Sequence, residues 1–206
     1  DPRDTAAFVK ELSRWPFTAL TGVNTLFQSL VRNPDFAKLD FSTLKVVSAG
    51  GMATQEATAR EWAKLTGTHI VEGYGLSETS PVVSSNPLDL QAFNGSIGLP
   101  LPGTEIAIRD EQGREVALGE PGELFVRGPQ VMLGYWKDPK ATREVLSEDG
   151  WLLTGDVAQM DEDGYCRIVS RKADMWYPKN DHKQPAFPRD IEEVLYEVPQ
   201  VKEVAV

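Results

Sequence analysis

The 206-residue chain is poor in several residue types, and each shortage excludes a class of protein. Cys166 is its single cysteine, which excludes a scaffold built on internal disulfides. No apolar run approaches the roughly 20 residues of a membrane-spanning helix, and no signal-peptide pattern opens the chain. Basic residues number 21 against 31 acidic ones, and the net charge of -10 repels a nucleic acid backbone. We therefore expect a cytoplasmic protein that does not bind nucleic acid.

What remains is the composition of an ordinary globular protein, with 41% hydrophobic and 25% charged residues. The length suits one domain, or one and a half domains of something longer. The chain starts without methionine at Asp1 and stops at Val206, inside an apolar run typical of a strand. We expect a truncated piece of a longer protein.

The first part of the chain alternates strand-like and helix-like segments. Strands are predicted near residues 17–20, 45–48 and 68–72, and helices over 24–31 and 54–65. Asn24 is predicted to cap the first of these helices, and a helical stripe including Trp15 precedes it. This alternation is typical of βαβ units and predicts an α/β fold with a parallel sheet.

From about residue 95 the pattern changes to short strands between glycine and proline turns. These strands are predicted over residues 104–109, 123–127 and 157–160, with acidic hairpin loops at 111–113 and 161–164. They predict a meander or a small antiparallel barrel. A new amphipathic helix is expected from Pro188, with acidic residues near its start.

Three regions follow from these patterns. Residues 1–94 are expected to form the βαβ part of a large domain, and residues 95–170 a β-rich subdomain of the same domain. Residues 171–206 are expected to hold a hinge and the start of a small α+β C-terminal domain.

The strongest local signal directly follows the third predicted strand. It reads Glu72-Gly73-Tyr74-Gly75-Leu76-Ser77-Glu78-Thr79. At the carboxyl end of a parallel strand, such a loop faces the crevice where open α/β sheets bind ligands. The glycines allow close approach of a ligand, and the Tyr74 ring offers a flat face to a base. Ser77 supplies a hydroxyl for phosphate, and Glu78 a hard oxygen for Mg²⁺.

Three further stretches strengthen this interpretation by their order. Ser48-Ala49-Gly50-Gly51-Met52 follows the preceding strand, so we expect it beside the Tyr74 loop. The stretch that ends in Thr154-Gly155-Asp156 supplies a carboxylate, which accepts from both hydroxyls of a ribose. Arg171, in Ser-Arg-Lys, supplies a permanent cation where the last region begins.

In this order, four motifs resemble the adenylate-forming superfamily of acyl-CoA synthetases, luciferases and peptide-synthetase adenylation domains. They are Tyr74–Thr79, Gly122–Pro129, Trp151–Asp156 and Ser170–Lys172. Three other stretches are most similar to bacterial long-chain fatty acid CoA ligases: Thr21–Phe27, Ala49–Met52 and Gly128–Trp136. The resemblance runs through residues 8–175 and resumes at Pro188.

The resemblance implies roles for residues of this chain. Nucleotide contact is assigned to Gly50, Gly51, Met52, Glu72, Gly73, Tyr74, Gly75, Ser77, Asp156 and Arg171. Within this set, Tyr74 stacks on adenine, Asp156 holds the ribose hydroxyls and Arg171 assists it. Ser77 stands where the family usually has threonine against the phosphates. Glu78 matches the ligand of Mg²⁺.

The implied reaction uses ATP, Mg²⁺ and CoA. A fatty acid carboxylate attacks the α-phosphorus of ATP, which releases pyrophosphate and gives an acyl-adenylate, and the CoA thiol then displaces AMP. The resemblance places the glycine-rich phosphate loop before Asp1 and the catalytic lysine after Val206, so no catalytic residue is assigned here. An insoluble substrate is compatible with peripheral contact with a membrane.

Two departures from the family and two alternative functions accompany this interpretation. Ala173 stands where the family has a Lys or Asp hinge, and residues 176–187 are polar where an apolar strand and a glycine loop are expected. A local change of reading frame would explain the second departure.

The alternatives are another adenylate-forming unit, acting on aryl acids or within a peptide synthetase, and a catalytically incompetent fragment that binds nucleotide weakly.

Overall fold

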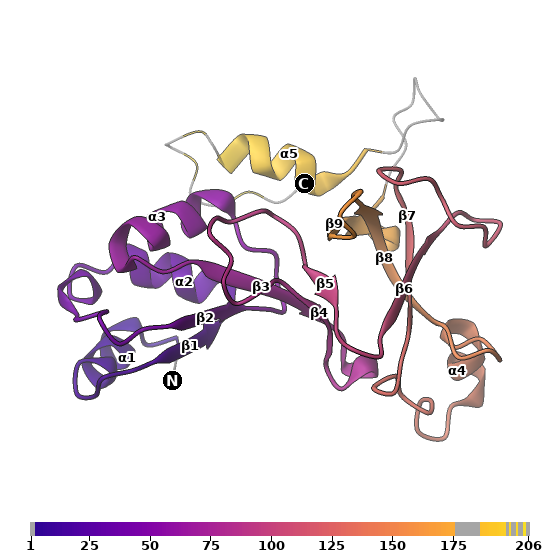
Figure 1. Cartoon of the computed structure of the whole chain (residues 1–206), viewed down its shortest axis with the longest axis horizontal. Coiled ribbons are helices and arrows are strands. Elements are labelled where there is room, and N and C mark those ends of the chain that lie inside the picture. The colour runs from indigo at the N-terminus through magenta and orange to yellow at the C-terminus, as the bar shows by residue number, and fades with distance from the viewer. Residues whose placement is uncertain (1–2, 176–185, 197, 199–200, 202–203, 205–206) are drawn as a thin grey trace. The chain divides into compact units, whose positions relative to one another are not determined.

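The computed structural model describes residues 3–175, 186–196, 198, 201 and 204 (Figure 1). The chain divides into two compact units. The first unit comprises Asp1–Tyr74 and Ser85–Gly95, and the second comprises Gly75–Ser84 and Ser96–Val206. Among the described helices, none has the length and apolar character needed to cross a bilayer.

The first unit is built on parallel strands joined by helices. Its elements in chain order are α1 (Thr5–Leu12), β1 (Ala19–Gly22), α2 (Asn24–Val31), η1 (Phe36–Lys38), β2 (Val46–Ala49), α3 (Glu56–Thr66) and β3 (Ile70–Gly75). Leu20 of β1 lies opposite Val47 of β2, which in turn lies opposite Ile70 of β3. The predicted βαβ alternation is confirmed.

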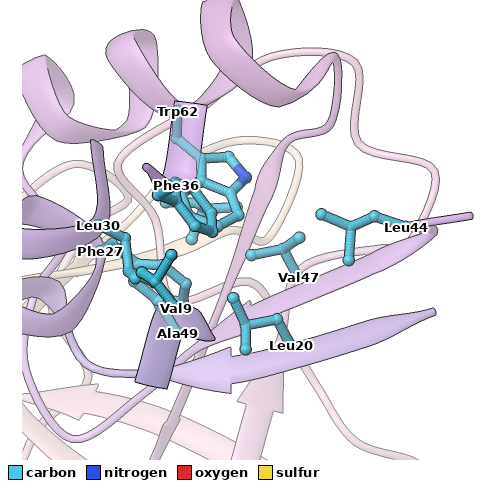
Figure 2. Packing of buried hydrophobic residues seen from close by; sticks show 10 residues of the cluster. Val9, Leu20, Phe27, Leu30, Phe36, Leu44, Val47, Ala49 and Trp62 are labelled. Atoms are coloured by element: carbon cyan, nitrogen blue, oxygen red, sulfur yellow. The ribbon is translucent and has the colours of Figure 1, made fainter. Parts of the chain in front are cut away.

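An aromatic cluster fills the space between the helices and strands of this unit (Figure 2). Trp62 of α3 is fully buried, with its ring centroid 5.0 Å from that of Phe27 and 5.5 Å from that of Phe36. The indole Nε1–H donates to the Thr68 hydroxyl at 3.1 Å, so the burial leaves no unmet donor. Phe27 and Leu30 of α2 are three residues apart and share the buried face.

Two details of the sequence prediction are wrong in this unit. α1 ends at Leu12, so Trp15 lies beyond the helix and is 69% exposed. Val23, in an extended conformation, is the N-cap of α2, and Asn24 is the first helical residue. The Asn24 side-chain oxygen instead accepts from the backbone N–H of Gln55 at 3.1 Å, which ties the start of α3 to α2.

The second unit holds the remaining elements, most of them strands. They are η2 (Ser77–Thr79), β4 (Val82–Ser85), β5 (Leu99–Pro100), β6 (Glu105–Arg109), β7 (Gly122–Arg127), α4 (Pro139–Val145), β8 (Leu152–Met160), β9 (Cys166–Arg171), η3 (Lys172–Asp174) and α5 (Pro188–Tyr196). Strands β6 to β9 form an antiparallel sheet in chain order, which confirms the predicted meander. Helix α5 was also predicted.

The buried face of this sheet alternates as an antiparallel strand should. Leu124 and Val126 of β7 are fully buried, and Val126 lies opposite the buried Leu152 of β8. The neighbouring Trp151 is 7% exposed and contacts two guanidinium groups. The carbons at the centres of the Arg109 and Arg127 guanidinium groups are each 4.6 Å from a ring centroid of Trp151. Two cation–π contacts therefore help to cover the indole.

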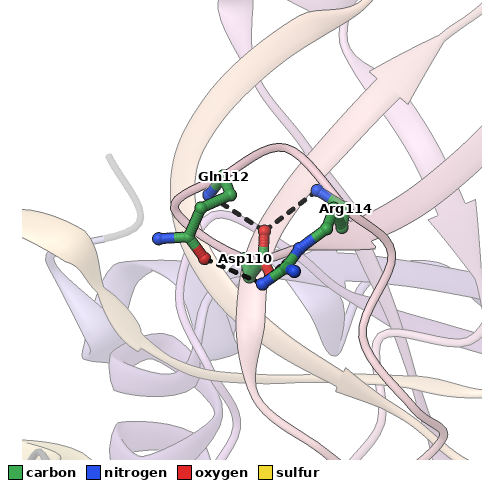
Figure 3. Close-up of polar contacts among 3 residues, drawn as sticks. All are labelled: Asp110, Gln112 and Arg114. Atoms are coloured by element: carbon green, nitrogen blue, oxygen red, sulfur yellow. Dashed lines mark hydrogen bonds and ion pairs between the residues drawn. The ribbon is translucent and has the colours of Figure 1, made fainter.

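The two acidic turns are organised by aspartate side chains, as the hairpin prediction requires. Asp110 accepts from the backbone N–H groups of Gln112 and Arg114, each at 2.9 Å, and from the Arg114 guanidinium (Figure 3). Chiefly because of the Arg114 backbone hydrogen bond, the pKa of the Asp110 carboxyl is lowered. Asp161 organises the β8–β9 turn in the same way, accepting from the Tyr165 N–H at 2.8 Å.

Two expectations from the sequence stay predictions. The unusual segment 176–187 lies outside the described residues except at its last two positions. The division of the chain into regions 1–94, 95–170 and 171–206 remains a prediction.

Candidate functional site

In the first unit, the ends of β2 and β3 are neighbours, as predicted. Ala49 of β2 lies opposite Glu72 of β3 in the parallel register. Gly50 donates its N–H to the Gly22 carbonyl at 3.2 Å, and a Cβ on Gly50 would lie 3.7 Å from the Gly73 carbonyl oxygen. The glycine backbone thus lies at the carboxyl edge of three strands. Tyr74 is half-buried beside it.

The predicted loop at residues 72–75 is in fact the end of a strand. β3 continues to Gly75, and Glu72 within it is hydrogen-bonded through both its side chain and its backbone. Its carboxylate is buried and accepts from the Thr54 N–H at 2.7 Å, while its carbonyl accepts from the Asn86 N–H at 2.9 Å. The Glu72 side chain therefore ties the segment after Met52 to β3.

The turn after β3 explains the second glycine of the motif. A Cβ on Gly75 would lie 1.9 Å from the carbonyl oxygen of Pro81, closer than any side chain allows. This approach lets Leu76 donate its N–H to the same oxygen at 3.0 Å. The fully buried Thr79 hydroxyl also bonds to Leu76 and Pro81. Ser77 is left exposed at the start of η2.

A cavity of about 370 Å³ in the second unit collects the charged candidates. Its wall includes Glu78, Tyr135, Thr154, Asp156, Arg171 and Ala173. Glu78 comes from η2, Asp156 from β8 and Arg171 from β9, so three stretches far apart in sequence converge. The structure brings these three predicted residues together.

Asp156 is the most buried charged group of the cavity, at 5% exposed. It lies inside β8 rather than after a turn, with Gly155 before it at a φ of +74°, a conformation that favours glycine. Thr154 fixes this distortion by accepting from the Asp156 N–H and donating to the Leu124 carbonyl.

Arg171 supplies the nearby positive charge. It lies opposite Asp156 in the β8–β9 register, and its Nε is 3.5 Å from Asp156 Oδ1. The Arg171 side chain is 71% exposed, while that of Asp156 is 8% exposed. The ion pair therefore connects an exposed guanidinium group with a buried carboxylate. A carboxylate held this way is ready to accept hydrogen bonds from hydroxyl groups that enter the cavity.

Tyr135 is a cavity residue to which the sequence analysis assigned no role. Its phenol donates to Glu78 Oε1 at 2.8 Å, and chiefly because of this hydrogen bond the pKa of Tyr135 is raised. Tyr135 lies in the stretch 128–136, which contributed to the family resemblance. A contact across 57 positions gives no local pattern in a single sequence.

The donor set fits a divalent cation held jointly with phosphate. In the described part of the chain, no three His, Cys, Asp or Glu side chains form a metal-binding group. Mg²⁺ usually takes one or two carboxylates from the protein and completes its shell with water and substrate phosphate oxygens. Glu78, half-buried on the cavity wall, suits such a partial site.

Comparison with known proteins places this geometry in a family. The model for AMP-binding enzymes matches residues 1–136. The chain belongs to the AMP-binding enzyme family. Among curated members, it is 56% identical over 206 residues to a long-chain-fatty-acid–CoA ligase of Yersinia pestis, covering all of this chain and 36% of that protein. The namesake from Escherichia coli O157:H7 is 52% identical over 205 residues, again 36% of its length.

Solved structures share the fold of the chain. A crystal structure of the anthranilate CoA ligase AuaEII with anthranoyl-AMP matches the whole chain with a TM-score of 0.89 at 29% identity. ATP-bound MatB from Rhodopseudomonas palustris matches with a TM-score of 0.86 at 32% identity. The chain covers 39% of each of these two, and about a third of the length of the curated relatives it matches.

Proposed function

We propose that the chain is the nucleotide-handling segment of an ATP-dependent long-chain fatty acid CoA ligase. Such an enzyme joins a carboxylate to AMP with release of pyrophosphate and then transfers the acyl group to the thiol of CoA. The carrying observation is Asp156, a buried carboxylate that shares one cavity with Glu78 and Arg171. Identity of 52–56% to proteins named long-chain-fatty-acid–CoA ligase supports the substrate class.

Asp156 is proposed to accept hydrogen bonds from the ribose hydroxyls. Its backbone is fixed through Thr154, and its burial makes each charge-assisted bond stronger than the same bond in water. Arg171, 3.5 Å away, would help to orient the carboxylate. The exposed end of Arg171 would remain available to the ligand.

Adenine contact is proposed for the edge formed by β2 and β3. Tyr74 would stack on the base, and the backbone at Gly50, Gly51 and Gly73 would border its plane. Met52, 53% exposed, would add an apolar contact. Glu72 would support this edge rather than contact the base through its side chain, since its carboxylate already accepts a hydrogen bond from Thr54.

Phosphate and cation are proposed to meet at η2. Ser77 would donate its hydroxyl to phosphate, and Glu78 would coordinate Mg²⁺. When bound there, Mg²⁺ neutralises negative charge that develops on the phosphate oxygens. The protein's part is to hold the Glu78 carboxylate at the cavity wall, which it does through η2 and Tyr135.

The alternative adenylate-forming functions would use the same nucleotide site. They differ in the acid they take, and the much higher identity to fatty acid ligases than to the anthranilate ligase favours a fatty acid. A fragment that binds nucleotide without turnover is the third candidate. The titrations that test the proposal also measure the nucleotide affinity of such a fragment.

The test is a calorimetric titration of the chain with AMP, with GMP and with ATP plus Mg²⁺. We expect saturable binding of AMP, and Tyr74→Ala should weaken the binding of AMP and GMP alike, because either base would lose its stacking partner. Tyr165→Ala, on the turn organised by Asp161, is the matched control and should bind like wild type. A folded wild-type chain that binds none of the three nucleotides would refute the proposal for this chain.

A further inference from the structure

The loop between β7 and α4, residues 128–138, is attached to Glu78 at two points. The backbone N–H of Met132 donates to the Glu78 carbonyl at 2.8 Å. The phenol of Tyr135 donates to Glu78 Oε1, also at 2.8 Å. Both bonds reach one residue of η2 from more than fifty positions away, so the backbone and the carboxylate of Glu78 are oriented by the same loop.

The position of Tyr135 is itself fixed from the other side. Its backbone N–H donates to the Thr142 hydroxyl at 2.9 Å, and that hydroxyl donates to the Asp138 carbonyl at 2.8 Å. Asp138 caps α4 by accepting from the Ala141 N–H at 2.9 Å. The phenol thus projects from a segment anchored to a helix, and its reach to Glu78 does not depend on a mobile side chain alone.

We propose that Tyr135 is a positioning residue that holds the Glu78 carboxylate for the divalent cation of a bound nucleotide. The inference rests on the proposed function. A carboxylate has about four acceptor sites, so one hydrogen bond from Tyr135 restricts its rotation and leaves sites for a cation. Fixing this rotamer before binding removes an entropy cost that the cation would otherwise have to overcome.

The proposed role of Tyr135 differs from that of the residues that contact the base and the ribose. It contacts Glu78 and lines the cavity, and the residue is 37% exposed. Removal of its hydroxyl should weaken the cation-dependent part of nucleotide binding. It should leave the cation-independent part unchanged, because Asp156 and Tyr74 remain as they were.

The test compares wild type with Tyr135→Phe, which keeps the ring and removes the hydroxyl. ATP affinity is measured by calorimetry at increasing Mg²⁺, and AMP affinity is measured with the cation chelated. We expect the Mg²⁺ concentration for half of the affinity gain to rise about three- to tenfold, the equivalent of one hydrogen bond. AMP affinity without cation should stay within about twofold of wild type.

Controls separate a positioning role from a structural one. Tyr165→Phe, on the β8–β9 turn, should leave the Mg²⁺ response unchanged. Glu78→Gln should abolish the response, and adding Tyr135→Phe to it should change the response no further. The urea midpoint of each variant shows that all are folded under the conditions of the titration.

Each outcome decides a different claim. Wild-type dependence on Mg²⁺ that Tyr135→Phe leaves unchanged overturns the positioning role and leaves the proposed function standing. AMP binding by wild type without any gain from Mg²⁺ overturns the cation role of Glu78 and the inference with it. Absence of all nucleotide binding by the folded chain overturns the proposed function as well.

Discussion

Gly75 and Gly50 both belong to the candidate site, yet their surroundings predict effects of very different size on substitution. A Cβ on Gly75 would meet Pro81 backbone at 1.9 Å, whereas one on Gly50 would make an ordinary 3.7 Å contact. We expect Gly75→Ala to lower the free energy of unfolding by about 1–3 kcal/mol or more, as overpacking does. Gly50→Ala should change it by less than about 0.5 kcal/mol. Urea denaturation followed by circular dichroism measures both; equal midpoints would contradict the strand-end geometry.

The Cys166 thiol should be unreactive while the chain is folded. It is fully buried in β9, and burial raises the pKa of its thiol to about 11. Since the thiolate is the reactive form, a thiol reagent at roughly pH 8 should label the folded chain far more slowly than the urea-unfolded chain. Because the folded pKa is raised, the thiol's contribution to stability is constant below its ordinary pKa and declines as pH rises toward about 11. Rapid labelling of the folded chain would contradict this burial.

At the residue scale, the sequence indicated the groups whose chemistry is local to a motif. Asp156 and Arg171 were identified, and the structure brings them to 3.5 Å. Tyr135 and the internal role of Glu72 were missed. Both depend on partners distant in sequence, Glu78 and Thr54, and a side-chain contact of this kind follows from the fold rather than from any spacing.

Helix α4 carries a prediction at the scale of an element. It begins with Asp138 as N-cap, followed by Pro139, and spans Pro139–Val145. The Asp138 carboxylate accepts from Ala141 N–H, so Asp138→Ala should destabilise the chain by about 1 kcal/mol. Asp138→Asn keeps the acceptor and should lose little. Urea midpoints for the pair provide the measurement; an equal loss in both variants would show that charge, not capping, is responsible.

Element boundaries were predictable to within a few residues, and the errors have a common cause. β3 was expected to end at Glu72 and continues to Gly75, and β8 was expected from residue 157 and starts at Leu152. In both places glycines were taken as turns. Gly75 is instead required by the approach of Pro81, and Gly155 distorts a strand that continues through it.

At the scale of the whole molecule, hydrophobic periodicity predicted the fold class correctly. Alternating strands and helices became the parallel first unit, and short strands between turns became the antiparallel meander. Periodicity does not specify which side chains converge on a cavity, and Glu78, Tyr135 and Asp156 meet only because η2, the β7–α4 loop and β8 belong to one compact unit.

The central claim, that Asp156 holds the ribose of an adenine nucleotide, has a direct measurement. AMP and 2′,3′-dideoxy-AMP are titrated against wild type and Asp156→Asn. Hydrogen bonds to a charged group contribute roughly 1.5–3 kcal/mol each, so wild type should prefer AMP by about tenfold or more. Asp156→Asn should lose most of that preference while binding dideoxy-AMP much as wild type does. An AMP preference that survives unchanged in Asp156→Asn would contradict the ribose assignment.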